Sequence, residues 1–179
     1  LKDSTAFLLT QAMMDVMKSG GTASDVSIGE MPIAGKTGTT SDDRDIWLAG
    51  YSPYYTCSVW GGYDNHDTLP SGDIYHTYHK KLWTAIMSRI HENLPVRQFE
   101  QPDSVETAYV CKKSGLLAVD GVCTGDPRGS MAYTEYFAKG TTPTKSCDVH
   151  TAVKVCSSTG LLPTATCTTT TKIFVKRPA

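Results

Sequence analysis

The stretch of this sequence best suited to chemistry is Gly35-Lys36-Thr37-Gly38-Thr39-Thr40, a lysine–threonine pair flanked by glycines. One kind of site with such a pair is the phosphate loop G-x-x-x-x-G-K-[ST], which opens into a helix whose N-terminus faces the phosphate. In this chain Glu30 occupies the position of the first glycine, and a polar turn at 41–44 follows instead of a helical pattern. We therefore do not expect a nucleotide-binding loop.

The other kind of site is the K-T-G strand of penicillin-recognising serine enzymes. By this match, the Lys36 ammonium would attract a carboxylate, and the hydroxyls of Thr37 and Thr39 would bond to the same group. Gly35 and Gly38 would let an extended peptide lie close along the strand. The Thr39 N–H would be one oxyanion donor. The alternative is an ordinary edge strand with a solvated lysine, because K-T-G often occurs by chance.

The residues around the motif carry a wider resemblance, in the runs Ala34–Thr40, Asp45–Tyr51 and Val59–Tyr63. Together they resemble the C-terminal part of a penicillin-binding protein transpeptidase domain, of the bifunctional class A type of Gram-positive bacteria. The resemblance extends back to residues 3–9 and 20–22 and on into a cysteine-bearing tail. It implies that Lys36, Thr37, Gly38 and Thr39 are site residues.

The family's other motifs are missing. No serine has lysine three places on, so the nucleophile motif S-x-x-K does not occur, and neither does S-x-N. Tyr63-Asp64-Asn65 has the related Y-x-N form, but it follows K-T-G, whereas the family places that motif before it. We therefore expect a fragment that begins after the first two motifs and is inactive alone.

The resemblance also implies a function. A serine in upstream sequence would be acylated by a D-Ala-D-Ala peptide and would pass the acyl group to an amine, which cross-links peptidoglycan. The expected partners are stem peptides, β-lactam antibiotics and the upstream remainder of the domain, with no cofactor. The parent would be anchored on the extracytoplasmic face of the membrane, with a glycosyltransferase domain. The alternatives are a fragment of a serine β-lactamase or D,D-carboxypeptidase, and a non-enzymatic cell-wall-binding module.

Composition is compatible with one folded domain and an appendage in 179 residues. A net charge of −1, from 17 basic and 18 acidic residues, gives no electrostatic reason to expect nucleic acid as a partner. No apolar run approaches the roughly 20 residues of a membrane span. The start at Leu1 is neither a signal peptide nor a natural initiator, so an anchor would belong to upstream sequence.

The first part of the chain predicts an α+β fold, an antiparallel sheet with packed helices. A helix is expected over 4–18, with an apolar stripe of Ala6, Leu9, Met13 and Val16 or Met17. A loop at 22–30 and strands over about 32–40, 45–51 and 54–62 follow, joined by connections short enough for an antiparallel meander.

A second helix is expected from Asp73 or Ser71 to Glu92. Its predicted buried stripe consists of Ile74, Tyr78, Leu82, Ile86 and Ile90. His76 and His79 lie three residues apart on this helix. Helical zinc sites use other spacing and a glutamate, so a half-exposed helix face is favoured over a metal site.

A composition shift divides the chain into a transpeptidase-like part at 1–97, a linker at 98–104 and a tail at 105–179. The tail is expected to be loop-rich, and it contains a repeat: Val110–Leu117 recurs as Val155–Leu162, with the shared pattern V-C-x-x-[ST]-G-L-L. Such small units are too poor in apolar residues to be stable alone.

The six cysteines allow 15 disulfide pairings. A second cysteine follows each repeat at similar spacing, so we expect the local disulfides Cys111–Cys123 and Cys156–Cys167. No C-x-x-C pair and no matched histidines are apparent, so no metal site is expected. Cys57 is expected to be a buried hydrophobe in a strand. Cys147 has no obvious partner and could compete for one of the others.

Overall fold

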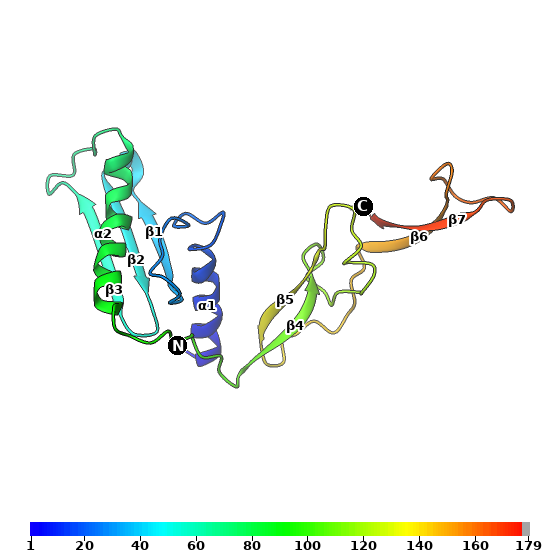
Figure 1. Cartoon of the computed structure of the whole chain (residues 1–179), viewed down its shortest axis with the longest axis horizontal. Coiled ribbons are helices and arrows are strands. Elements are labelled where there is room, and N and C mark those ends of the chain that lie inside the picture. The colour runs from blue at the N-terminus through cyan, green and yellow to red at the C-terminus, as the bar shows by residue number, and fades with distance from the viewer. Residues whose placement is uncertain (177–179) are drawn as a thin grey trace. The chain divides into compact units, whose positions relative to one another are not determined.

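The computed structural model describes residues 1–176 and divides the chain into two compact units, Leu1–Pro102 and Asp103–Ala179 (Figure 1). The division falls inside the expected linker at 98–104. Within the described residues, no helix combines the length and the apolar character needed to cross a membrane.

The first unit contains one antiparallel sheet and two helices (Figure 1). Its strands are adjacent in chain order: β1 (Ala34–Thr39), β2 (Asp45–Tyr51) and β3 (Thr56–Gly62). A single 3-10 turn, η1 (Ser41–Asp43), connects the first two strands. Helix α1 (Asp3–Asp15) contacts β1, and helix α2 (Asp73–His91) contacts β2 and β3. The α+β meander predicted from the sequence is confirmed.

The core of this unit lies between α2, the sheet and the segment after α1. Trp83 and Met87 of α2 are fully buried against Leu48 of β2. Gly50 makes this packing possible, because a Cβ there would lie 2.9 Å from the Trp83 ring and 3.0 Å from the Ala34 carbonyl oxygen. Strand β2 therefore needs a glycine where the indole crosses it.

The predicted buried stripe of α2 is wrong by one residue. The buried residues are His79, Trp83, Met87 and His91. The expected core residues are instead exposed or half-buried: Ile74, Tyr78, Leu82, Ile86 and Ile90. Both stripes have four-residue spacing, and the two histidines make the buried stripe the less apolar one, so apolar periodicity favours the wrong stripe.

Hydrogen bonds explain why the polar rings of Trp83 and His91 can occupy the buried face of α2. The Trp83 indole N–H donates to the Cys57 carbonyl oxygen at 3.0 Å. The two ring nitrogens of His91 lie 2.7 Å from the Ser52 hydroxyl oxygen and 2.6 Å from the Met87 carbonyl oxygen. Buried polar groups with partners are well tolerated, so these residues can pack inside.

Helix α1 also differs from expectation. Its buried residues are Phe7 and Thr10, whereas Leu9 of the predicted stripe is 50% exposed. The Thr10 hydroxyl lies 2.8 Å from the Tyr51 hydroxyl, a contact that gives a polar residue a place on the inner face. Cys57 is half-buried at the edge of the core.

The second unit is richer in strands than the sequence suggested. It contains β4 (Val105–Cys111), β5 (Ala132–Ala138), β6 (His150–Cys156) and β7 (Thr169–Val175). These form two separate antiparallel pairs, β4–β5 and β6–β7, each joined by a long irregular connection (Figure 1).

The sequence repeat is a repeat of structure. In the first copy the Cys111 N–H donates to Leu116 O and the Gly115 N–H to Cys111 O, both at 2.8 Å. The second copy has the same two bonds at the same length, around Cys156 and Gly160. The two glycines have φ of +70° and +71°, a conformation that favours glycine. The pattern V-C-x-x-[ST]-G-L-L thus encodes one strand end and its turn.

Candidate functional site

The K-T-G triplet lies in the middle of an edge strand. Strand β1 pairs with β2 alone, so its other edge is open among the described residues. The Thr40 N–H donates to the Asp45 carbonyl oxygen at 3.0 Å, which places even-numbered residues toward β2. Backbone groups alternate in direction along an antiparallel strand, so the Thr39 N–H points to the open edge. It is there available to a ligand oxygen.

Lys36 is exposed and reaches the same edge. Its ammonium Nζ donates to the carbonyl oxygen of Thr37 at 2.6 Å. This bond holds the charge against the strand without burying it. An anion at the edge would meet a positive charge and a backbone N–H from neighbouring residues of one strand.

The two threonines lie on the other face of the strand. Thr37 is opposite buried Leu48 in the sheet register, whereas Lys36 is opposite exposed Ala49. The Thr37 hydroxyl lies 2.7 Å from the Thr22 hydroxyl, in the segment that follows α1. Lys36 and the Thr37 hydroxyl can therefore share one carboxylate only if it lies at the strand edge. The sequence analysis did not identify Thr22 as a neighbour of the K-T-G motif.

The sheet face that carries Lys36 also exposes aromatic rings. Trp47 and Trp60 are cross-strand partners, 43% and 41% exposed, with ring centroids 6.4 Å apart. The Trp60 indole N–H donates to Asp45 Oδ1 at 2.9 Å, which fixes one of the rings. Exposed aromatic surface beside the motif is typical of a face that contacts further protein or ligand.

The other expected motif does not join this strand. Tyr63-Asp64-Asn65 follows β3, at the far side of the sheet from β1, and the Asn65 side-chain amide donates to Asp67 at 2.7 Å. His79 is buried on α2, and His76 is half-buried.

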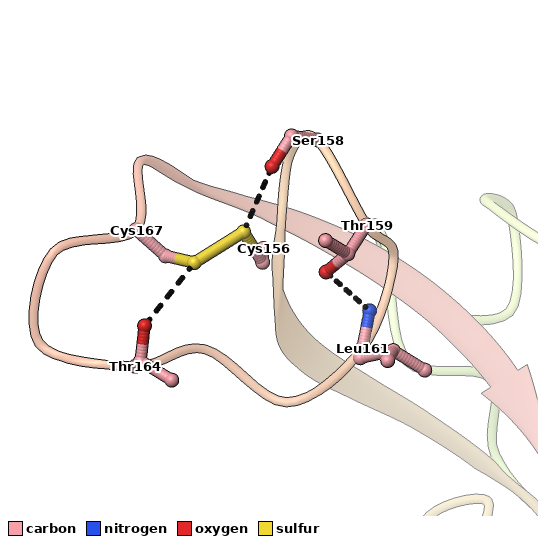
Figure 2. The surroundings of a disulfide bond; sticks show 6 residues. All are labelled: Cys156, Ser158, Thr159, Leu161, Thr164 and Cys167. Carbon is pink, nitrogen blue, oxygen red and sulfur yellow. Dashed lines mark hydrogen bonds between the residues drawn. A yellow bond between two sulfur atoms is a disulfide. The ribbon is translucent and has the colours of Figure 1, made fainter.

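One of the two expected disulfides is present. Cys156 and Cys167 are joined, and the bond spans the β6–β7 connection (Figure 2). The Cys156 sulfur is also within hydrogen-bonding distance of the Ser158 hydroxyl, and the Cys167 sulfur accepts from Thr164.

The other expected disulfide is contradicted, because Cys111 and Cys123 are free and fully buried. The reason is a competing group. Cys147 and His150 approach the same two thiols from the start of β6. The sequence signal that was missed is the C-x-x-H spacing of Cys147-Asp148-Val149-His150, which supplies the histidine that had seemed absent.

The thiols of this cluster differ in how readily they ionise. Burial raises the pKa of the Cys123 thiol to about 11. Burial opposes ionisation at Cys147 too, but hydrogen bonds from Ser114 and His150 outweigh it and lower the pKa of that thiol to about 6. The Arg128 guanidinium holds the pKa of Asp126 well below its usual range, so this buried carboxylate is ionised.

Comparisons with known proteins agree on one family. The family model for the C-terminal domain of penicillin-binding protein 1A matches residues 101–152. Penicillin-binding protein 1A of Clostridium botulinum is 38% identical over 162 residues, which are 90% of this chain and 19% of that protein. The Clostridium perfringens protein of the same name is 35% identical over 150 residues, 84% of this chain and 18% of its own.

A solved structure gives the same result. The crystal structure of penicillin-binding protein 1A from Haemophilus influenzae matches with a TM-score of 0.63 and 25% identity, over 80% of this chain and 21% of that one. The chain thus spans about a fifth of the length of the relatives it matches.

Proposed function

We propose that this chain, which is similar over most of its length to penicillin-binding protein 1A of Clostridium botulinum, forms the carboxylate-binding wall of a peptidoglycan D,D-transpeptidase site. The observation that carries the proposal is the open edge of β1. It presents the Lys36 ammonium and the Thr39 N–H together, on a strand that glycine keeps accessible.

Each residue has a role in this proposal. Lys36 attracts the C-terminal carboxylate of a stem peptide, or the carboxylate of a β-lactam, and the Thr37 and Thr39 hydroxyls hydrogen-bond to it. The Thr39 N–H contributes to the oxyanion hole as the carbonyl is attacked. Gly38 leaves the edge open for the extended peptide. The Thr37 hydroxyl would exchange its bond with Thr22 for one to the substrate.

The nucleophile belongs to another part of the enzyme. A serine outside these residues takes the acyl group of the donor peptide, releases its terminal D-alanine, and is deacylated by an amine of a second stem peptide. The exposed rings of Trp47 and Trp60 support a docking role for that remainder, because they lie on the face that carries Lys36. Such an enzyme would act on the extracytoplasmic side of the membrane, in a protein that also carries a glycosyltransferase domain.

Replacing Lys36 tests the proposal in the complete protein. Lys36→Ala removes one charged contact to the carboxylate and is expected to slow acylation by a labelled penicillin by about 10²–10³-fold. The matched control is Lys81→Ala, an exposed lysine on α2, which should acylate at the parent rate. Equal rates for Lys36→Ala and the parent would contradict the proposal, and unchanged thermal unfolding would show that both variants are folded.

A further inference from the structure

Three thiols and one imidazole meet in the second unit, away from the K-T-G strand. The Cys-His cluster consists of Cys111 at the end of β4, Cys123 in the connection to β5, Cys147 before β6 and His150 at its first residue. Residues far apart in the chain thus come to one point. Cys111, Cys123 and His150 are buried, and Cys147 is half-buried.

The four ligand atoms lie close enough together to bind one metal ion. One atom from each residue lies within 4.8 Å of all the others. Nδ1 of His150 is 3.4 Å from Sγ of Cys111 and 3.4 Å from Sγ of Cys147. Zinc bonds of about 2.3 Å to sulfur and about 2.0–2.1 Å to nitrogen place such atoms about 3.5 Å apart at tetrahedral angles. The two nitrogen–sulfur distances match this value, and the remaining pairs lie within 4.8 Å.

A second set of contacts aims the imidazole at the thiols. His150 Nε2 lies 2.9 Å from Oδ2 of Asp126, and both side chains are fully buried. Asp126 is held by the Arg128 guanidinium at 2.9 and 2.7 Å and by the Arg128 backbone N–H at 2.9 Å. An ionised carboxylate only accepts, so Nε2 carries a proton, and in the neutral ring that binds a metal ion the lone pair is on Nδ1, which faces the sulfurs. A carboxylate behind a histidine is the usual outer shell of a zinc ligand.

Backbone groups are also arranged for thiolates. The Lys113 N–H donates to Sγ of Cys111 at 3.4 Å, and the Val119 N–H donates to Sγ of Cys123 at 3.3 Å. Hydrogen bonds to sulfur favour its charged form. Two of the three sulfurs therefore already accept a hydrogen bond from a backbone N–H, a group that does not itself bind a metal ion.

The second repeat provides the contrast. Its cysteines, Cys156 and Cys167, have nearly the same spacing in sequence as Cys111 and Cys123 but form a disulfide. No histidine or third thiol joins them among the described residues. In the first repeat an odd number of thiols meets a histidine, so a disulfide would leave one thiol and the oriented imidazole unused. A metal ion uses all four.

We propose that Cys111, Cys123, Cys147 and His150 bind one Zn²⁺ in a closed structural site. The cysteines bind as thiolates, so each thiol that is still protonated gives its proton to solvent, and the site has net charge −1 from one divalent cation and three thiolates. Three sulfurs and one imidazole in a tetrahedral arrangement suit zinc better than oxygen-seeking cations. The four ligands leave no open position for substrate, so the ion has no catalytic role.

The consequence is structural. The ion fastens the beginning of β6 to the end of β4, so it joins the two repeats of a unit that has few large buried side chains. Binding energy at such a site adds to folding energy. This inference does not depend on the transpeptidase proposal.

The test begins with the whole chain, reduced and stripped of metal. Zinc is titrated in competition with a chromophoric chelator, and bound metal is counted by elemental analysis after desalting. One zinc per chain, held more tightly than by the chelator, is expected. Cobalt should give the visible absorption of tetrahedral thiolate ligation, a readout that does not depend on any activity.

Matched variants locate the site. Cys147→Ser and His150→Ala should each lose stoichiometric binding, whereas Cys57→Ser and the double variant Cys156→Ser/Cys167→Ser should retain it. Asp126→Asn keeps all four ligands and is expected to weaken zinc binding about 10–100-fold, because it loses the charge that orients His150. This variant stays informative if removal of a ligand unfolds the unit.

Three results would overturn the proposal. One is the absence of stoichiometric zinc binding by the reduced parent chain. Another is equal affinity in Cys147→Ser and Cys57→Ser. The third is a disulfide between two of the three clustered cysteines in freshly isolated protein that holds no zinc, shown by non-reducing peptide mapping.

Discussion

His79 is a buried imidazole on α2 whose Nδ1 has no hydrogen-bond partner among residues 1–176. Burial lowers its pKa below the ordinary histidine value, and the positive charge of Lys80 acts in the same direction. The ring is therefore neutral in the folded chain. A proton that binds the unfolded chain more readily than the folded one makes stability depend on pH.

The sign of this dependence gives a prediction. The stability contributed by neutral His79 is present above the unfolded pKa of about 6.5 and is lost as pH falls through the lower folded value. Denaturant unfolding at about pH 8 and about pH 5, followed by tryptophan fluorescence, should show a smaller loss for His79→Gln than for the parent. All three tryptophans, Trp47, Trp60 and Trp83, lie in the first unit, so the signal reports this unit alone.

The control is His66→Asn at an exposed loop position with φ of +58°, which asparagine tolerates. It should keep the full pH dependence of the parent. If His79→Gln loses as much stability as the parent between the two pH values, the buried neutral ring is not the cause.

At single positions, the sequence was informative where a residue's role depends on its near neighbours. The K-T-G stretch was identified from the six consecutive residues Gly35–Thr40, and it lies on a strand edge that is open among the described residues, while its role stays a prediction. The Cys-His cluster was missed because Cys111 and His150 lie 39 residues apart. The pairing of Cys111 with Cys123 was inferred from local spacing, and a partner distant in sequence displaced it.

Helix α2 was predicted within one residue at its end, yet its inner face was assigned to the wrong residues. Start and stop signals are local, whereas the choice of the buried face depends on what the sheet offers. Here Gly50 leaves room for the Trp83 indole, and the Cys57 carbonyl oxygen accepts a hydrogen bond from its N–H. Trp83 therefore faces the core, and the aliphatic residues of the helix face outward. Tertiary contacts thus decided the rotation of the helix about its axis.

Adjacent residues of α2 test this rotation directly. Met87 is fully buried, and Ile86 is 39% exposed. Met87→Ala is expected to lower the free energy of unfolding by about 2–5 kcal/mol through the cavity it leaves. Ile86→Ala should change it by no more than about 1 kcal/mol, since the side chain is already partly exposed to solvent and its truncation leaves no closed cavity.

Denaturant titration of the whole chain, followed by tryptophan fluorescence, measures both variants. The same substitution of adjacent residues controls for helix propensity, since alanine is the product in each case. A larger loss for Ile86→Ala than for Met87→Ala would restore the stripe predicted from the sequence and refute the observed packing.

At the scale of the chain, the two units are stabilised by different interactions. The first has a helix-on-sheet core around Trp83, the kind of layer that apolar pattern predicts. The second has two small strand pairs held by the Cys156–Cys167 disulfide and by the contacts of the Cys-His cluster. Composition alone suggested a loop-rich tail, because a threonine-rich strand such as β7 lacks the apolar alternation that identifies a half-buried strand.

The catalytic capacity of the chain gives the last prediction. Acylation requires a hydroxyl activated by an adjacent base. The sequence contains no S-x-x-K motif, and the Thr37 hydroxyl of the candidate site is bonded to another hydroxyl, that of Thr22. The isolated chain is therefore expected to show no added mass after incubation with penicillin, in intact-mass analysis. A full-length relative treated in parallel should gain one penicilloyl group, and a stoichiometric adduct on this chain would mean that a nucleophile lies within these residues.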